Sequence, residues 1–327
     1  MKIGNRKKCK LVCIALCAIH FSSSVAKAQQ PKKVHRIGYL STSSSARITS
    51  GAFGQGLRDL GYVDGKDLII VYPSAAGTLA ARAAELVHLK VDVIVTGGAT
   101  VTRAAKEATS TIPIVFLQDP DPVGNGIVTS LARPAGNITG LSSMSADLVG
   151  KRMELLREIL SKLSRLAVLG QSKNAGNGIQ LRETERAAAT LGVQLQYLDI
   201  LSINDVETAF REASKAGAEA VFVLAGPLFN LQPALVPQYA VKNKLPAAYS
   251  RSDFVESGGL MTYAVNRADL DRRAATYVDK ILKGAKPAEL PVEQPTKFEF
   301  VINLKAAKQI GLMIPPNILA RADRVIR

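Results

Sequence analysis

Short apolar runs alternate with amphipathic stretches along most of the chain. The runs RIGYL, DLIIVY, VDVIV and IPIVF predict buried strands, and the stretches near residues 47–60, 78–90 and 99–109 predict the helices between them. The expected apolar helix faces are Leu79, Ala83, Leu86 and Val87, and then Leu155, Leu156, Ile159 and Leu163. The strand runs are apolar at successive positions, as in strands covered on both faces. This alternation predicts βαβ units around a parallel sheet.

The same pattern occurs twice. Three segments recur at shifts of 129, 131 and 127 residues: Arg36–Leu40 as Arg165–Leu169, Leu60-Gly61 as Leu191-Gly192, and Asp92 as Glu219. Nearly equal shifts indicate an internal repeat, so we expect an α/β protein of two similar Rossmann-like lobes with parallel sheets, joined by a hinge. Loops that follow corresponding strands should then converge on one cleft between the lobes.

The N-terminus has the pattern of a secretory signal peptide. Lysines and one arginine precede the apolar stretch LVCIALCAIHF, and Ala26-Lys27-Ala28 follows it. An apolar stretch of this length is too short to span a bilayer as a helix. We therefore expect residues 1–28 to be removed by cleavage after Ala28 and the mature protein to be periplasmic. A lipoprotein is the alternative, but Leu16 stands where a small residue would precede an acylated Cys17.

Composition limits the chemistry of the mature chain. All three cysteines, Cys9, Cys13 and Cys17, lie in the predicted signal peptide, so no disulfide or cysteine metal site is expected. Removal of six basic residues with the signal lowers the formal net charge from +15 to +9. The remaining basic residues are scattered and aromatic residues are few, so we interpret the charge as solvated surface and expect no nucleic-acid partner.

In the first lobe, small and polar residues follow the predicted strands. Ser43 and Ser44 belong to a serine run that could bind a ligand carboxylate or be only a polar turn. Gly97, Gly98 and Thr100 form a small-residue turn before a helix, which allows a ligand to approach the backbone. Two further candidates, Gln118 and Asp121, follow the next strand; Asp121 either caps the helix expected after Pro122 or also contacts ligand.

In the second lobe, the equivalent loops contain Gln171, Phe229, Tyr249 and Ser250 as candidate ligand contacts. Phe229 or Tyr249 could stack on an aromatic ligand, although an aromatic residue after a strand is as often packed in the core. For Tyr263, near the expected crossover between the lobes, a hinge role competes with a pocket role.

Neither a catalytic nor a metal site is predicted. The mature chain has only His35 and His88, and it lacks the short motifs of zinc proteases, serine hydrolases, P-loop proteins and dinucleotide-binding enzymes. The segment Asp119–Gly124 resembles a calcium loop only at its start, because Ser130 stands where a bidentate glutamate is needed. We expect no cofactor and no enzyme activity, with a secreted α/β enzyme or a ligand sensor using the same cleft as the alternative.

Long blocks of the chain resemble the substrate-binding proteins of ABC transporters, of the tryptophan and tyrosine type, which have the type I periplasmic-binding fold. The blocks include RIGYLS, FGQGLRDLGYVDGKDL, AAELVHLKVDVIVTGG, DPVGNGIVTSLARPAGNITGLS and IPPNILARAD. The resemblance implies a monomeric receptor that closes on a small organic ligand, amino-acid-like or aromatic, and delivers it to an ABC permease in the inner membrane. It also implies lobes of residues 34–143 plus 268–290 and residues 144–267 plus 291–327.

Two departures from the family concern the ligand. Relatives often carry an acidic residue where this chain has Gly226, and a Trp-Asn-Pro stretch where it has Gly170-Gln171-Ser172. An acid at the first place could hold an amino group. Its absence leaves two ligand classes open, an α-amino acid paired with Asp121 and a ligand that is not an amino acid.

Overall fold

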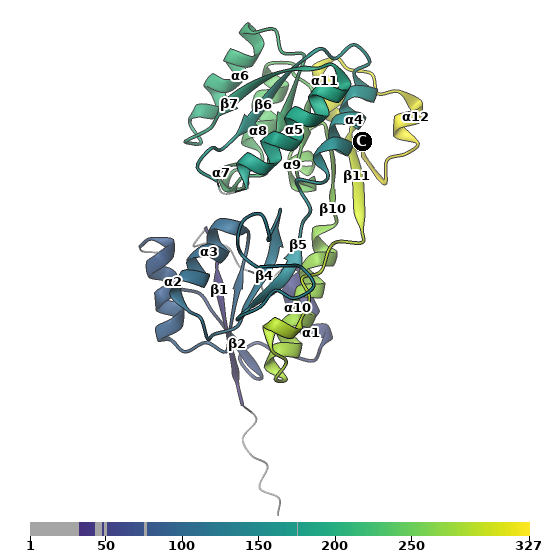
Figure 1. Ribbon diagram of the computed structural model, residues 1–327. Coiled ribbons are helices and arrows are strands. Elements are labelled where there is room, and N and C mark those ends of the chain that lie inside the picture. The colour runs from purple at the N-terminus through teal and green to yellow at the C-terminus, as the bar shows by residue number, and fades with distance from the viewer. Residues whose placement is uncertain (1–32, 43–47, 49–50, 75–76, 175) are drawn as a thin grey trace, which may run out of the picture. The chain divides into compact units, whose positions relative to one another are not determined.

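The computed structural model describes residues 33–42, 48, 51–74, 77–174 and 176–327. The predicted signal peptide, with Ser43 and Ser44 of the serine run, lies outside these residues. Val34–Arg327 form one compact unit, shown as a ribbon in Figure 1. Among its described residues, no helix is both long enough and apolar enough to cross a membrane.

The first sheet contains five parallel strands in the order β2-β1-β3-β4-β5. Their bounds are β1 His35–Leu40, β2 Leu68–Val71, β3 Val93–Thr96, β4 Ile114–Asp119 and β5 Ile138–Ser142. The helices of this part are α1 Ala52–Asp59, α2 Leu79–His88, α3 Ala99–Ala108 and, from much later in the chain, α10 Arg267–Leu282. Apolar residues of α10 pack with β3, β4 and β5 in one core cluster, so the late helix completes the first lobe.

The second sheet contains seven strands in the order β12-β11-β10-β9-β8-β6-β7. Its strands are β6 Arg165–Gly170, β7 Gln194–Asp199, β8 Ala220–Val223, β9 Ala247–Tyr249, β10 Met261–Val265, β11 Phe298–Asn303 and β12 Arg324–Ile326. Its helices are α4 Val149–Ile159, α5 Asn177–Leu191, α6 Asp205–Lys215, α7 Pro227–Leu231, α8 Leu235–Lys242, α9 Ser252–Glu256, α11 Leu304–Ile310 and α12 Pro316–Leu319. Only the β10–β11 pairing is antiparallel.

The two sheets confirm the internal repeat. Strands β1 to β5 and strands β6 to β10 follow the same spatial order, with the first strand of each set between the second and the third. The repeated acids occupy equivalent positions as well. The Arg36 backbone N–H donates to Asp92 at 2.8 Å, and the Arg165 backbone N–H donates to Glu219 at 3.1 Å. Each carboxylate therefore binds the backbone at the start of the first strand of its own sheet.

The predicted apolar faces are buried. Ala83 and Leu86 of α2 are fully buried, and Leu79 and Val87 pack against the same cluster. The four residues of the later face, which extends from α4 to Leu163, lie in the core of the second lobe. Helix α1 begins at Ala52, later than the predicted start near residue 47.

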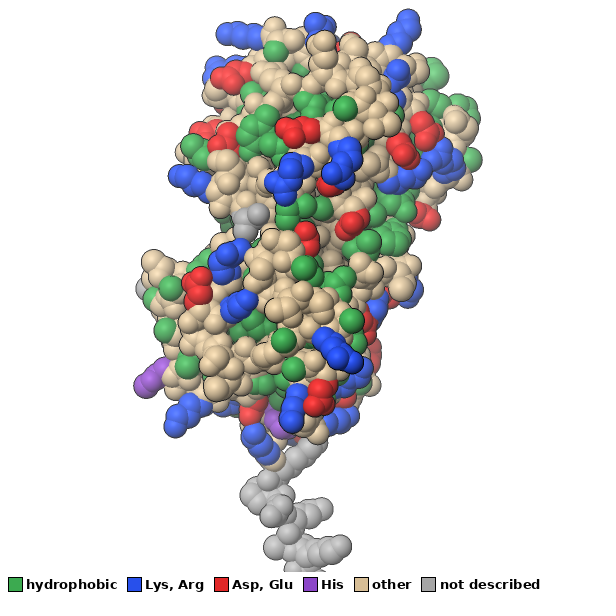
Figure 2. Space-filling view, viewed as in Figure 1, with side chains coloured by type: hydrophobic (Ala, Val, Ile, Leu, Met, Phe, Trp, Pro, Cys, Tyr) green, Lys and Arg blue, Asp and Glu red, His purple; other side chains and the backbone are tan. Residues whose placement is uncertain are grey.

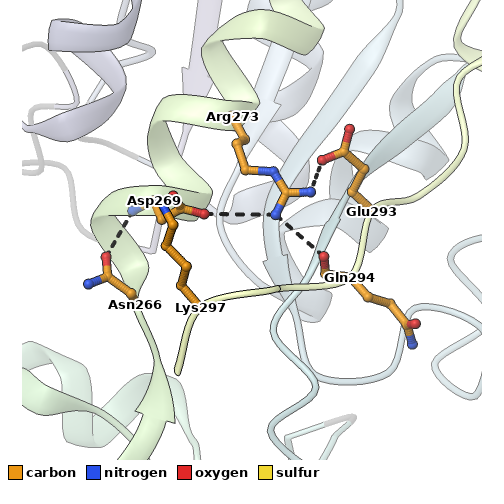
Figure 3. A network of polar contacts seen from close by, with 6 residues as sticks. All are labelled: Asn266, Asp269, Arg273, Glu293, Gln294 and Lys297. Carbon is orange, nitrogen blue, oxygen red and sulfur yellow. Dashed lines mark hydrogen bonds and ion pairs between the residues drawn. The ribbon is translucent and has the colours of Figure 1, made fainter. Parts of the chain in front are cut away.

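The chain passes between the two sheets three times: after β5, between β10 and α10, and between α10 and β11. A polar network holds the second and third passages together at the start of α10 (Figure 3). Asn266 caps the helix by accepting from the Asp269 backbone N–H at 3.0 Å, and Lys297 donates to the Asp269 carboxylate at 2.7 Å. Arg273 bonds Glu293 and the carbonyl of Gln294 on the returning segment. The lobe boundaries given above stay a prediction.

Candidate functional site

A cavity of about 440 Å³ lies where the loops after strands of the first sheet meet those of the second. The first sheet supplies residues that follow β1, β3 and β4, and the second supplies residues that follow β6, β8, β9 and β10. Carboxyl ends of parallel strands are the usual place for ligands in such sheets. The volume is in the range of small-molecule sites, roughly 300–1,000 Å³.

The first-sheet wall of the cavity is built mainly from backbone and small side chains. Gly97 and Gly98 connect β3 to α3, and Gly98 precedes the helix with a φ of 83°, a left-handed conformation that favours glycine. No side chain caps α3, so the N–H groups of its first turn have no partner within the helix. Ala99, Thr100 and Val101 of that turn line the cavity. The partial positive charge of the helix start therefore acts on this wall.

The residues that follow β9 and β10 include two arginines. Arg251 follows β9, and Arg267 is the first residue of α10, the helix that completes the first lobe; both residues line the cavity and both are half-buried. The Arg251 Nε donates to Asp253 Oδ1 at 3.0 Å, and its Nη2 also bonds that carboxylate. No hydrogen bond or ion pair holds the Arg267 side chain within the described part of the chain.

Asp271, one turn further along α10, is the acid that acts on both arginines. The Gln118 amide donates to its Oδ1 at 3.2 Å. Burial raises the pKa of Asp271, while Arg267, the Gln118 hydrogen bond and Arg251 oppose the increase. Asp271 itself does not line the cavity. Burial lowers the pKa of Arg251 to about 10, and the like charge of Arg267 adds to that effect.

Five of the predicted site residues line the cavity. These are Gly97, Gly98, Thr100, Gln118 and Ser250. Ser43 and Ser44 lie outside the described residues, although Ser41 and Thr42 at the start of the same run line the cavity. That any of these residues contacts a ligand stays a prediction.

Four other candidates lie elsewhere in the structure. Phe229 and Tyr249 are fully buried in the core of the second lobe, where Tyr249 stacks on Phe254 with ring centroids 5.5 Å apart. Gln171 is buried beside Gly226, and its side-chain oxygen accepts from the Leu228 backbone N–H. None of these three residues lines the cavity, because Phe229 and Tyr249 pack in the core and Gln171 is bonded to the start of α7.

Asp121 does not line the cavity either. Its carboxylate accepts from the Gly124 backbone N–H at 2.8 Å, which is a capping bond. The helix expected after Pro122 is wrong, since residues 122–126 form hydrogen-bonded turns. Tyr263 on β10 stacks on Phe298 of β11, with centroids 6.0 Å apart, at the passages between the sheets.

Neither arginine was among the ligand contacts predicted from the sequence, although Arg251 lies in a predicted loop and a further signal was present. A cation at the first turn of a helix opposes the helix dipole, which favours acids there. Arg251 occupies the N-cap of α9 and Arg267 the first position of α10. Residues placed against the local preference of the backbone are expected at functional sites.

The family model described as "ABC transporter substrate binding protein" matches residues 33–326. The chain belongs to this family. Substrate-binding proteins of ABC transporters of this kind have the type I periplasmic-binding fold, and the two lobes described above are that fold.

Individual relatives of this substrate-binding protein agree with the family. It is 26% identical over 297 residues to a tyrosine-binding protein of Clostridioides difficile (strain R20291), covering 89% of this chain and 85% of the relative. A conserved domain protein from Vibrio cholerae has a TM-score of 0.82 at 29% identity, over 90% of this chain and 100% of that one. An ABC domain from Streptococcus pneumoniae in complex with L-Trp has a TM-score of 0.80 at 25% identity, with the same coverage.

Proposed function

We propose that this substrate-binding protein is the periplasmic receptor of an ABC importer and captures one small organic ligand in the cavity between its lobes. The observation that carries the proposal is the composition of the cavity wall, to which both sheets contribute residues. A ligand that contacts both walls gains those contacts only when the lobes close on it. This difference in affinity is what shifts a hinged protein toward its closed state.

The relatives support an amino-acid-like or aromatic ligand as the first class to screen. One relative is a tyrosine-binding protein and another was crystallised with L-Trp. Tyr39 and the apolar side chains of Leu117, Leu231 and Val265 line the cavity and could contact an apolar ligand body.

An enzyme that uses the same cleft is the competing proposal. Neither histidine of the described residues is near the cavity wall: His35 starts β1 beside Asp92, and His88 ends α2. The described residues also contain no group of three His, Cys, Asp or Glu side chains able to hold a metal ion. We therefore expect the ligand to leave the protein chemically unchanged.

The remaining parts of the proposal concern partners and location. Figure 2 shows Lys and Arg side chains dispersed over the face in view, with Asp and Glu between them, which supports solvated surface charge over a nucleic-acid site. We expect a monomer that docks on an inner-membrane permease. The exported chain should begin at Gln29, as mass spectrometry of the mature N-terminus would show; acylated Cys17 would contradict it.

A metabolite screen by thermal unfolding tests the function. At about 100 times its dissociation constant, a ligand should stabilise the folded chain by roughly 2.7 kcal/mol. Small-angle scattering of the same sample should show a more compact protein. Chemical conversion of the ligand, or the failure of any small molecule to stabilise the chain, would contradict the proposed receptor.

A further inference from the structure

The charges on the cavity wall have one sign. Arg251 and Arg267 line the cavity, and no Asp or Glu lines it within the described part of the chain. The internal segments outside the described residues, 43–47, 49–50, 75–76 and 175, contain no acidic residue in their sequence. A ligand ammonium would therefore meet two guanidinium groups and no carboxylate on this wall.

Arg267 is available to bind a ligand. It makes no ion pair or hydrogen bond to any residue that the structure describes, although it is half-buried. The neighbouring acid on the same helix, Asp269, is bonded by Lys297 and pairs with Arg273 at 3.8 Å (Figure 3). The network thus occupies the Asp269 carboxylate, and Asp271 attracts Arg267 without forming an ion pair with it.

The Arg251 guanidinium is held in place by an acidic residue, but not all of its N–H donors are used. Two bonds from its guanidinium to Asp253 fix the group, which also lies over the Phe254 ring at 5.8 Å from the centroid. A fixed guanidinium keeps further N–H donors for a second, planar acceptor. Asp271 attracts both arginines but forms no ion pair with either of them. An anion between Arg251 and Arg267 would relieve their mutual repulsion.

The Gln171 side chain occupies the place beside Gly226, so a side chain at position 226 would have to displace it. Gly226 lines the cavity, and a Cβ atom built there would lie 2.5 Å from the Gln171 amide nitrogen. Gln171 thus fills the space that a side chain at position 226 would need. On the opposite wall, the uncapped N-terminus of α3 favours negative charge as well.

We propose that the ligand of this site is a small organic carboxylate that carries no ammonium group, bound through Arg267 and the free edge of Arg251. This inference deepens the proposed receptor function and rests on it. The carboxylate would form charge-assisted, bidentate hydrogen bonds with a guanidinium, which are the strong ones in proteins. An α-amino acid would make the same bonds but would bring an ammonium that finds no carboxylate in the described lining.

Matched pairs of ligands test the class directly. Calorimetry would compare 3-(indol-3-yl)propanoate with L-tryptophan, 3-(4-hydroxyphenyl)propanoate with L-tyrosine, 4-methylpentanoate with L-leucine, and glutarate with L-glutamate. The members of each pair differ only in the α-ammonium group. We expect at least one acid to bind, and to bind about 10-fold or more tightly than its amino partner. Tighter binding of any amino acid than of its matched acid, or binding of no acid, would overturn the proposal.

Variants of Arg267 test the role of the residue. Arg267→Gln should weaken the acid that binds best by about 10- to 100-fold, and Arg267→Glu should weaken it further and reduce the preference over the amino partner. Glutamate suits the first turn of a helix, so the fold should be retained. Arg272→Gln is the matched control, since Arg272 is exposed on the same helix and does not line the cavity. Wild-type affinity in Arg267→Gln would contradict the assignment.

The ligand carried through purification separates the two proposals. Native mass spectrometry of the protein exported by its producing cell, followed by release and identification of the bound molecule, should yield an acid without an amino group. A released amino acid, sugar or cation would overturn the ligand class and leave the receptor function standing. A released reaction product would overturn the receptor function itself.

Discussion

The loops after β1, β3 and β4 and the loops after β8, β9 and β10 form two cavity walls with opposite character. The first-sheet loops supply glycines, small polar residues and the backbone of the α3 N-terminus, whereas the residues that follow β9 and β10 include Arg251 and, at the start of α10, Arg267. The strands that support them have the same order in both sheets. The repeated topology therefore determines where the cavity lies, and a few loop residues that are not repeated determine the charge of its lining.

The glycines of the two walls differ in the same way. A Cβ atom at Gly97 would meet no heavy atom of the described residues within 4 Å, while one at Gly226 would overlap the Gln171 side chain. Among the described residues, the space beside Gly97 is thus open, and the space beside Gly226 is occupied by protein. Substitutions at the two positions should consequently fail for different reasons.

Gly97→Leu should have the largest effect on this comparison. Its side chain would extend into open space beside the cavity, so the variant should fold normally and lose at least about 100-fold in ligand affinity, or about 2.7 kcal/mol. Gly150→Leu is the control, because a Cβ there also meets nothing and Gly150 does not line the cavity. Calorimetry would measure both variants; unchanged affinity in Gly97→Leu would show that the ligand does not approach this loop.

The ends of β4 and β9 should differ in their response to pH. Asp119 is fully buried at the end of β4, and burial raises its pKa from 3.8 to about 6 against opposing hydrogen bonds from Asn125 and Asp121. Because the folded chain retains a proton that the unfolded chain has lost, the free energy of unfolding should decrease as pH rises from about 4 to 6. Above that window the loss is roughly 2 to 3 kcal/mol. The end of β9 carries Ser250, which does not titrate in this range.

Asp119→Asn should remove this dependence. Urea unfolding between pH 4 and pH 7 should show the variant gaining stability relative to the wild type as pH rises, by roughly the amount stated above. Parallel curves for the two proteins would mean that Asp119 titrates alike in the folded and unfolded chains.

Gly226→Asp should lower the free energy of unfolding rather than act by blocking a ligand. The new side chain would overlap the Gln171 amide, at a cost of about 1 to 3 kcal/mol in the free energy of unfolding. Adding Gln171→Ala should restore part of that loss by making room. Denaturation of the single and double variants measures the recovery, and equal stability of the two would show that Gln171 is not the obstacle.

The smallest effect concerns the repeated acids at the other end of the strands. Asp92→Asn and Glu219→Gln should each lower the stability by about 1 kcal/mol, because each weakens a charge-assisted bond to the backbone. Glu212→Gln, on an exposed position of α6, should change it by less. A difference of more than about 1 kcal/mol between Asp92→Asn and Glu219→Gln would show that the two repeated acids do not stabilise their lobes equally.

The sheets and the location of the cavity could be predicted because they depend on local patterns. Continuous apolar runs separated by amphipathic helices specify parallel strands, and the position of a ligand site follows from strand polarity. Local patterns could not predict which side chains of the second-sheet loops line the cavity. Phe229 and Tyr249 belong to the predicted loops but turn into the core, and only packing decides that direction.

Arg267 was hidden for a different reason. Its position depends on α10, which packs on a sheet formed more than a hundred residues earlier in the chain. The polar network around Asp269 and Arg273 then fixes where the helix begins. Such long-range packing leaves little trace in a local sequence pattern, although the unfavourable place of a cation at a helix start could have indicated it.

The position of α10 also governs the order in which the chain can fold. The core of the first lobe includes Leu270, Ala274, Tyr277 and Val278, which are synthesised long after β5. At about 5 to 20 residues per second, the first lobe would wait roughly 7 to 30 s for its last helix. During that interval α10 does not yet pack on the apolar faces of β3, β4 and β5, so the first lobe cannot complete its fold. The first lobe therefore cannot complete its core until most of the second lobe has been synthesised, up to and including β10.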